Sequence, residues 1–510
     1  MTRETRNPLL KNLMEQCPFP HPVRDLHVAE THISRILLTG DYVYKFKKPV
    51  DLGFVDFTTL EKRKHFCDEE LRLNRRYNDE LYLDVVAITG TVESPTLDGE
   101  GKPFEYAVKM KQFPEETLLA RVIERDELRP RHFDQLAIDI ARFHERFAIA
   151  APDSSFGSPE TVLKPIDENF RQLFDAITDD ADLRSRLDAL ECWSKEEFSR
   201  LTPALQQRKR GGFVRECHGD MHLGNMILRN DRIILFDCVE FNESFRWVDL
   251  ISEVAFCVMD LQYRGHGEFA HRFLNRYLEE TGDYRGMDLF RFYLTYRALV
   301  RAKVAGIRLH QDGLTTEESE QIRQECAGYV SLAERFIKKH QQTLSITHGF
   351  SGSGKTWGTQ TIVDQEGAIR IRSDVERKRL FGLRPEEKSD SVIGDDFYSA
   401  EATERTYRVL REEAASLIDA GYSVIVDATF LDQHRRTQFR QLAENLGVPF
   451  HILSFQASDD VLRERIRERH AEGRDSSEAD LAVLEHQWRT AEPLTEEETP
   501  YVRLQAPPKG

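Results

Sequence analysis

The chain has 510 residues, of which 40% are hydrophobic and 10% aromatic, so it is expected to be a globular protein too long for one hydrophobic core. Its 88 acidic and 71 basic side chains give a net charge of −17, which argues against non-specific wrapping of nucleic acid by a basic face. Seven scattered cysteines, without a C-x-x-C pair, favour reduced thiols, and no apolar run is long enough for a signal peptide or a membrane span. A cytoplasmic protein without membrane contact is therefore expected.

The N-terminal region has the pattern of a small β-rich lobe. Residues 42–48 alternate between aromatic and other side chains after a Thr-Gly-Asp turn, which is typical of the second strand of a hairpin. The expected elements are a helix ended by Pro18, Pro20 and Pro22 at about residue 25, strands over 32–38 and 42–48, a helix over 58–77, and strands over 81–89 and 104–113.

The following region is predicted to be mostly helical. Apolar residues recur with helical spacing over 131–147, where His144 is expected to be a core histidine rather than a metal ligand. The other expected elements are a loop over 151–165, two helices within 166–210, a helix that opens at 247–250, and helices over 289–309 and 317–339.

Between these helices lies a polar motif, His218-Gly219-Asp220, followed by Asn225 and Asp237. Two short β runs, Met226–Arg229 and Arg232–Phe236, surround an Asn-Asp turn, so a hairpin should bring Asn225 and Asp237 to the same end. Phosphoryl transfer needs a carboxylate beside the attacking hydroxyl, and an amide oxygen with a second carboxylate to hold Mg²⁺. The motif resembles the kinase catalytic loop H-R-D-x-x-x-x-N, which has the same Asp-to-Asn step and a metal-binding Asp on a following strand. The resemblance implies Asp220 as the catalytic base and Asn225 and Asp237 as metal ligands.

The HGDxHxxN motif and the Phe236-Asp237 strand end resemble the aminoglycoside phosphotransferase and choline kinase branch of the protein-kinase-like fold. The resemblance implies a strand lysine on the nucleotide phosphates, for which Lys45 is the first candidate and Lys47 the second. It also implies Glu70 as the helix glutamate paired with that lysine, a hinge over the adenine at residues 110–114, and Asp249 as a brace for the catalytic loop.

A second nucleotide motif follows a predicted strand over 343–348. The sequence Gly349-Phe-Ser-Gly-Ser-Gly-Lys-Thr356 fits G-x-x-x-x-G-K-[ST], with a strand before it and a helix after it. In such loops, backbone N–H groups surround the β-phosphate, the lysine contacts the β- and γ-phosphates, and the threonine hydroxyl binds Mg²⁺. The predicted nucleotide-binding residues are Gly349, Ser351, Gly352, Ser353, Gly354, Lys355 and Thr356.

The rest of the C-terminal part alternates between strands and helices, which predicts a doubly wound parallel sheet. Strands are expected over 368–372, 422–426 and 450–455, and Ser373-Asp374 is expected to cap the helix after the first of them. Asp374 and Asp427 follow two of these strands. Ligands bind at the carboxyl ends of such strands, so both carboxylates should face the phosphate loop.

After residue 455, Ser458 should cap a helix that carries Arg463, Arg465, Arg467 and Arg469. Arg465 and Arg469 share one helix face, and Arg474 lies in the next loop. The RSDxxRK, DAT and arginine-rich elements resemble predicted kinases related to polynucleotide 5′-kinase, gluconate kinase and zeta toxin. The resemblance implies Asp374 as the catalytic base, Asp427 as a metal-orienting residue, and a lid in which Arg465, Arg469 or Arg474 steadies the γ-phosphate.

The whole chain resembles bacterial fusions of an aminoglycoside-phosphotransferase-like domain with a P-loop kinase-like domain of AAA type. The expected fold is a two-lobed kinase-like domain over 1–340, with lobes over 25–113 and 114–340, and a P-loop domain over 341–510. The expected activity is bifunctional transfer of phosphate from ATP (or GTP), with Mg²⁺, to a hydroxyl-bearing small molecule. The alternatives are a C-terminal kinase for nucleic-acid 5′ ends, one half serving as a nucleotide sensor for the other, and adenylyl transfer to protein.

Overall fold

The computed structural model describes residues 7–505 except 54, 178–179, 311–312, 390–396, 398 and 473–478. The chain divides into two compact units. The first comprises Met1–Gln135, Arg142–Lys164 and Leu205–Cys257, and the second comprises Leu136–Ala141, Pro165–Ala204 and Val258–Gly510. In this division the helices after Cys257 group with the C-terminal sheet.

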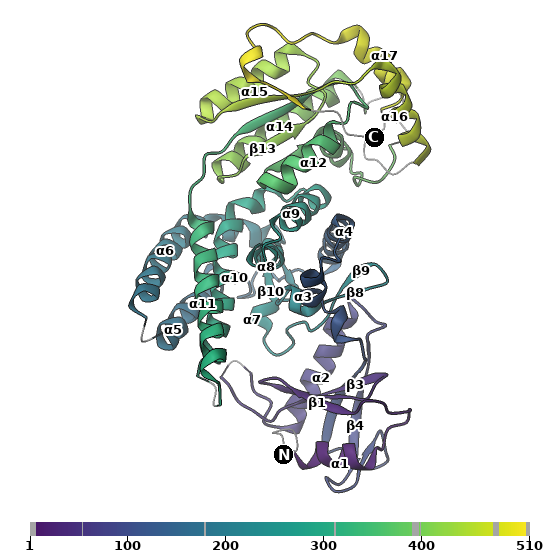
Figure 1. The fold of residues 1–510 in the computed structure, drawn as a ribbon, viewed down its shortest axis with the longest axis vertical. Helices are drawn as coiled ribbons and strands as arrows, with labels where there is room; N and C mark the ends of the chain where they lie inside the picture. The colour runs from purple at the N-terminus through teal and green to yellow at the C-terminus, as the bar shows by residue number, and fades with distance from the viewer. Residues whose placement is uncertain are drawn as a thin grey trace. The chain divides into compact units, whose positions relative to one another are not determined.

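The first unit begins with an antiparallel sheet, of which β1, β3 and β4 are labelled in Figure 1. Its strand order is β1-β2-β3-β6-β4-β5. Successive strand residues point to opposite faces, so Tyr44 and Phe46 pack in the cluster that includes Leu10 and Leu13 of α1, whereas Val43 packs with Cys67 of α2. The elements are α1 (Pro8–Gln16), β1 (His27–Glu30), β2 (Ser34–Leu38), β3 (Tyr42–Lys47), α2 (Leu60–Arg75), β4 (Tyr82–Gly90), β5 (Pro95–Leu97) and β6 (Glu105–Lys111).

Helix α1 is shorter than the sequence predicted. It ends at Gln16, and Cys17 takes a left-handed conformation with φ of 47°. The residue before a proline is disfavoured in the α-helical region, so Pro18 explains the stop at this position rather than near residue 25.

The catalytic motif lies on short strands of the first unit. Strands β8 (Met226–Arg229) and β9 (Arg232–Leu235) pair across a two-residue turn, in which Asn230 and Asp231 have φ of 52° and 60°. Both values suit a type I′ turn, so the predicted hairpin is present. The neighbouring elements are α3 (Leu119–Val122), α4 (Pro130–Arg146), β7 (Val214–Glu216), α7 (Glu243–Arg246), β10 (Trp247–Asp249) and α8 (Leu250–Tyr263).

Two predicted elements near this hairpin were wrong in detail. Trp247–Asp249 is strand β10, which pairs antiparallel with β7, and the helix starts only at Leu250. The predicted loop over 151–165 ends early, because helix α5 (Pro159–Ala176) contains Pro165. At β10 the pairing with β7 overrides the local sequence signal. Helix α6 (Ala181–Arg210) follows as predicted.

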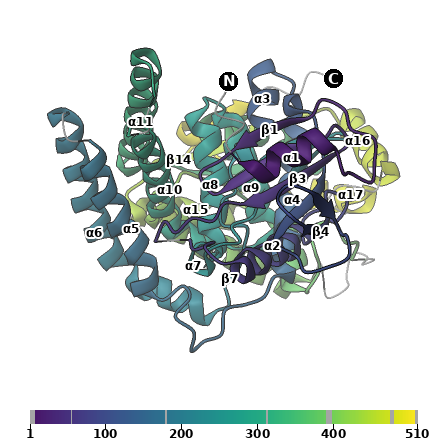
Figure 2. The same ribbon diagram turned by 90° about the horizontal axis from the view of Figure 1, so that it is seen from below.

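The second unit contains α9 (Gly267–Thr281), α10 (Met287–Arg308) and α11 (Thr316–Ile337), of which α10 and α11 lie side by side (Figure 2). Its sheet is wholly parallel, in the order β12-β13-β11-β14-β15. Strand β15 was not predicted. The elements are β11 (Leu344–His348), α12 (Lys355–Glu366), β12 (Ile369–Arg372), α13 (Ser373–Leu380), α14 (Ala400–Asp419), β13 (Val424–Asp427), α15 (Gln433–Leu446), β14 (Phe450–Phe455), α16 (Asp459–Glu472), α17 (Leu481–Thr490) and β15 (Val502–Gln505).

Candidate active sites

Lys45 on β3 lies between two carboxylates. Its Nζ donates to Oε1 of Glu70 on α2 at 2.8 Å and also bonds Oδ1 of Asp237, which follows β9. Burial acts to lower the pKa of Lys45, but the carboxylates of Asp237 and Glu70 raise it well above its usual value. The structure thus brings the first-choice strand lysine, the helix glutamate and the candidate metal ligand into one cluster.

Lys47, the second candidate, belongs to the interior side of the same cluster. Its Nζ bonds Oε2 of Glu70 and Oε1 of Glu240, and all three side chains are buried. Burial raises the pKa of Glu240. Burial also acts to raise the pKa of Glu70, but Lys45 and Lys47 together lower it. Glu70 is therefore shared between the two lysines, and Lys45 is the one that reaches Asp237.

Asp220 and Asn225 face each other across the catalytic loop. The Asn225 amide nitrogen donates to the carbonyl oxygen of Asp220 at 3.0 Å and to its Oδ2 at 2.8 Å. This leaves the Asn225 side-chain oxygen as the atom that could bind a metal. The N–H of Phe236 donates to the carbonyl oxygen of Asn225 at 3.0 Å, so the hairpin brings Asn225 close to Asp237. An amide oxygen and a carboxylate are ligands that Mg²⁺ prefers, so these residues fit the ion.

The backbone of Asp237 is held in an unusual conformation. Its φ is 64°, in the left-handed region that non-glycine residues seldom adopt. Its N–H donates to the Tyr82 hydroxyl at 3.0 Å, and the next N–H, of Cys238, donates to Oδ1 of Asn74 at 3.0 Å. Strained backbone persists where surrounding contacts over-determine it, and such positions cluster at functional sites. The contacts from α2 and β4 fix the direction of the Asp237 carboxylate.

The catalytic loop is held from behind by Glu253 of α8. Its two carboxylate oxygens accept the N–H groups of His218 and Gly219 at 2.7 and 3.1 Å. Gly219 has φ of 87°, and an added Cβ would lie 2.7 Å from the carbonyl oxygen of Phe245, so glycine is required there. Asp249, for which the resemblance implied the bracing role, instead holds Arg208 of α6 at 2.7 and 2.8 Å.

His218 itself is a neutral structural residue. Its Nε2–H donates to the carbonyl oxygen of Phe236 at 2.9 Å, and its Nδ1 accepts the N–H of Asp220 at 3.3 Å, so its partners require this tautomer. Burial lowers the pKa of His218 to about 4. Burial and, to a smaller extent, Arg215 lower the pKa of His144 to about 3. Both histidines are buried.

These two histidines predict acid sensitivity of the first unit. In the unfolded chain both histidines have a pKa near 6.5, whereas in the folded protein their pKa values are lower. The stability contributed by the neutral histidines is therefore full above pH 6.5 and falls as the pH drops toward 4. At pH 5 each histidine should lower the free energy of unfolding by about 2 kcal/mol. Hydrogen exchange at pH 7.5 and 5.0, corrected for intrinsic exchange rates, measures the loss of protection on acidification. This loss should be smaller in His144→Gln than in the wild type. A matched exposed-site variant, His27→Gln, should retain the wild-type loss; equal losses in all three proteins would contradict the prediction.

A pocket of about 260 Å³ lies against the segment predicted as the adenine hinge. The hinge is itself tied to the β2–β3 turn, because the N–H of Gln112 donates to the carbonyl oxygen of Asp41 at 3.0 Å and its side chain accepts from the N–H of Gly40 at 2.9 Å. The lining residues are Gly40, Asp41, Leu81, Lys111, Gln112, Phe113, Pro114, Thr117, Ile227 and Arg229. The lysine cluster and Asp220 are not among these lining residues.

The predicted phosphate loop of the second unit connects β11 to α12. Gly349 has φ of 149°, and an added Cβ would lie 2.5 Å from the carbonyl oxygen of Phe455, so a side chain cannot be placed there. The Lys355 ammonium donates to the carbonyl oxygens of Gly349 and Phe350 at 2.9 and 2.7 Å, across the loop. Within the described residues, the buried Ser353 hydroxyl has no hydrogen-bond partner. A loop with an inward ammonium and a buried unsatisfied hydroxyl fits a bound phosphate.

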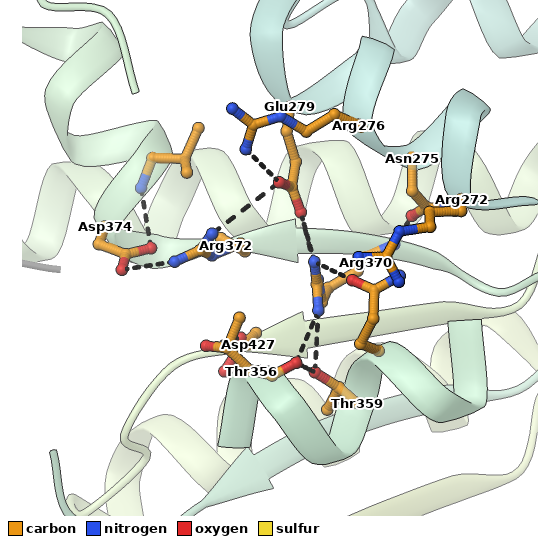
Figure 3. A network of polar contacts seen from close by, with 12 residues as sticks. Arg272, Asn275, Arg276, Glu279, Thr356, Thr359, Arg370, Arg372, Asp374 and Asp427 are labelled. Atoms are coloured by element: carbon orange, nitrogen blue, oxygen red, sulfur yellow. Dashed lines mark hydrogen bonds and ion pairs between the residues drawn. The ribbon is translucent and has the colours of Figure 1, made fainter. Parts of the chain in front are cut away.

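Asp374 and Asp427, the two carboxylates predicted to face this loop, lie just after β12 and at the end of β13. The Thr356 hydroxyl donates to Oδ2 of Asp427 at the end of β13, at 2.9 Å. Asp374 lies in the first turn of α13 and accepts from Nη2 of Arg372 at 3.1 Å (Figure 3). Burial acts to raise the pKa of Asp374, but Arg372 and the N–H of Val375 lower it. The predicted cap residue is different, because the N-cap of α13 is Arg372 and not Ser373.

The predicted arginine lid is only partly described. Nη1 of Arg465 lies 3.5 Å from the carbonyl oxygen of Gly352, so this arginine reaches the phosphate loop. Arg469 is on α16 but its side chain is outside the described residues, as is Arg474 altogether. A contact that the sequence did not reveal comes from α17. Gln487 accepts the N–H of Ser351 and donates to its hydroxyl, both at 2.9 Å.

The described residues include no helix with the length and apolar character needed to cross a membrane. The phosphotransferase enzyme family matches residues 67–290, and the AAA domain family matches residues 344–494. The first match begins within α2 and covers the catalytic loop, Asn225 and Asp237, and the second covers the phosphate loop, Asp374 and Asp427.

Several known proteins are similar to this chain. Uncharacterised proteins of Mycobacterium tuberculosis and Mycobacterium bovis are 28% identical over 479 residues, covering 92% of this chain and 93% of their own. A choline/ethanolamine kinase family protein from Mesorhizobium loti is 9% identical, with a TM-score of 0.41 over 65% of this chain and 95% of that chain. A gluconokinase from Sinorhizobium meliloti is 20% identical, with a TM-score of 0.24 over 33% and 83%. The chain thus carries a match to the phosphotransferase enzyme family, followed by a match to the AAA domain family in the region of the parallel sheet and the P-loop motif.

Proposed function

We propose that the chain is a bifunctional ATP-dependent phosphotransferase with one hydroxyl-kinase site in each half, and that residues 1–340 and 341–510 supply the two catalytic sets. The observation that carries the proposal is the presence of two separate lysine and carboxylate sets. One set combines Lys45, Glu70 and Asp237, and the other places Lys355 in the phosphate loop beside the Thr356–Asp427 pair.

At the first site, Lys45 would hold the nucleotide phosphates, with Glu70 fixing its direction. Asp220 would accept the proton of the acceptor hydroxyl as that oxygen bonds to the γ-phosphorus. The bond from the γ-phosphorus to the bridging oxygen breaks, and its electron pair leaves with ADP. Mg²⁺, when bound by Asn225 and Asp237, would neutralise charge on the phosphates.

At the second site, the phosphate-loop amides and Lys355 would surround the β- and γ-phosphates. Thr356, oriented by Asp427, would supply a hydroxyl to Mg²⁺, and Asp374 would accept the acceptor proton. Arg465 already contacts the phosphate loop and, together with Arg469 and Arg474, would stabilise the charge that develops on the transferring group.

The test is ADP release with Mg-ATP, alone and with a panel of sugars, amino alcohols, nucleosides and 5′-hydroxyl oligonucleotides. We expect Asp220→Ala and Lys355→Ala each to remove a different acceptor-dependent activity. If Lys355→Ala abolishes every activity, the activity of the N-terminal half depends on the C-terminal half, and the two sites are not independent. If only oligonucleotides respond to the Lys355 site, its acceptor is a nucleic-acid end.

A further inference from the structure

We propose that Glu279 is a positioning residue of the P-loop site, supplied by helix α9 from outside the residues that match the AAA domain. Glu279 falls instead within the stretch 67–290 that matches the phosphotransferase enzyme family. The inference rests on the proposed function of the P-loop site and adds to it a requirement that the AAA sequence does not contain.

Glu279 is the shared partner of two arginines on strand β12, and it also pairs with Arg276 of its own helix at 3.7 Å (Figure 3). Arg370 and Arg372 are two residues apart, so they point to the same face of the strand, and both are buried. Arg370 donates from Nε and Nη2 to Oε1 of Glu279 at 3.2 and 2.8 Å, and Nη1 of Arg372 lies 3.9 Å from Oε2. Glu279 is 1% exposed, so this carboxylate compensates buried positive charge.

Arg370 carries the effect of Glu279 to the first turn of α12. Its Nη1 donates to the carbonyl oxygen of Thr356 at 2.9 Å and to the Thr359 hydroxyl at 3.3 Å. The same Thr356 offers its hydroxyl to Asp427, which makes it the candidate Mg²⁺ ligand of the loop. A guanidinium held by Glu279 therefore fixes the backbone that presents this hydroxyl.

Arg372 carries the effect to the opposite side of the site. Its Nη2 donates to Oδ2 of Asp374, the proposed catalytic base, at 3.1 Å. Burial acts to raise the pKa of Glu279, but Arg370 and Arg372 keep it lowered, so the carboxylate is charged at neutral pH. One buried carboxylate thus restrains the guanidinium groups behind both the metal-binding and the proton-accepting side chains.

Hydrogen bonds and an ion pair hold helix α9 against β12 and α12, so Glu279 projects from a rigid element. Asn275 makes two bonds to the backbone at the start of β12, since it donates to the carbonyl oxygen of Ala368 at 3.1 Å and accepts the N–H of Arg370 at 2.8 Å. Arg272 pairs with Asp364 of α12 at 3.2 Å. These contacts anchor α9 to both elements that carry the site.

The test compares Glu279→Gln, Glu279→Asp and a control, Glu268→Gln, in the full chain. Glu268 is 46% exposed in the first turn of the same helix and pairs with His266. The readouts are kcat and KM for the Lys355-dependent activity, and binding of ATP with increasing Mg²⁺, followed by fluorescence of Trp357, which is next to Thr356 and 58% exposed. Lys355→Ala serves as the binding-deficient reference.

We expect Glu279→Gln to lower kcat about 10- to 100-fold, because small displacements of catalytic groups have effects of this size. KM for ATP should change less than about threefold, the Mg²⁺ needed for half-maximal binding should rise, and Glu279→Asp should recover part of the loss because it keeps the charge. Unchanged kcat and Mg²⁺ dependence would overturn the proposal, as would loss of ATP binding equal to that of Lys355→Ala. If the wild type binds ATP but transfers no phosphate, the proposed function fails, and the Mg²⁺ dependence alone decides the role of Glu279.

Discussion

Replacing Asp220 with Asn is expected to lower turnover at the first site by about 10³-fold, while the affinity for ATP changes little. The amide keeps the size of the side chain and an oxygen that can accept from the Asn225 amide, as Oδ2 does now at 2.8 Å. It removes only the charge and the ability to take the hydroxyl proton. Initial rates with the acceptor found for this site, together with ATP titration, measure the two effects separately.

The control for this variant is Asp231→Asn, on the β8–β9 turn. Asp231 is 59% exposed, pairs with Arg131, and has the left-handed backbone that Asn also tolerates. It should keep wild-type turnover. Turnover of Asp220→Asn within threefold of the wild type would exclude Asp220 as the base, because general base catalysis contributes on the order of 10²- to 10⁴-fold.

Replacing Lys47 with Met is expected to destabilise the first unit by about 3–5 kcal/mol, whereas Lys45→Met should mainly weaken nucleotide binding. Lys47 is 1% exposed and bonds both Glu70 and Glu240, so its removal leaves Glu240 buried without this partner. If Lys45 is removed, Glu70 still has Lys47. Hydrogen exchange in peptides from β3 and α2 reports the local free energy of opening in each variant.

The double variant Lys47→Met/Glu240→Gln separates charge burial from lost packing. Because the second change removes the buried charge, it should recover much of the stability lost in Lys47→Met. If Lys45→Met were as destabilising as Lys47→Met, or if the double variant recovered nothing, the division of roles between the two lysines would be wrong.

The catalytic elements that could be predicted from sequence are those whose partners are near in the chain. The Asn230–Asp231 turn fixes the register of β8 and β9, and this register places Asn225 beside the strand end that leads to Asp237. The phosphate loop is similar, because its glycines, Lys355 and Thr356 are contiguous. The overall fold class followed from these motifs and the alternation of strands and helices, and it is confirmed by the sheets and the two family matches.

The supporting residues could not be predicted in the same way. Glu253 lies 35 residues from the N–H of His218 that it accepts, and Glu279 lies 91 residues from Arg370. An isolated glutamate on an amphipathic helix usually lies on a solvated face, so sequence gives no sign that these two are buried. Gln487 is missed for the same reason. A sharper signal existed only for the β12 arginines, because two charges inside an otherwise apolar strand require a buried partner.

The position of Glu279 limits how this protein can be divided and how it could have arisen. A fragment that begins at residue 341 would keep the phosphate loop but would lose the counter-charge of Arg370 and Arg372, so its inactivity would say little about the intact enzyme. A fragment that begins before α9 is the fairer choice. For the same reason, replacing the C-terminal half with a free-standing relative would require a matching change in α9. Helix α9 and the P-loop domain are therefore expected to coevolve.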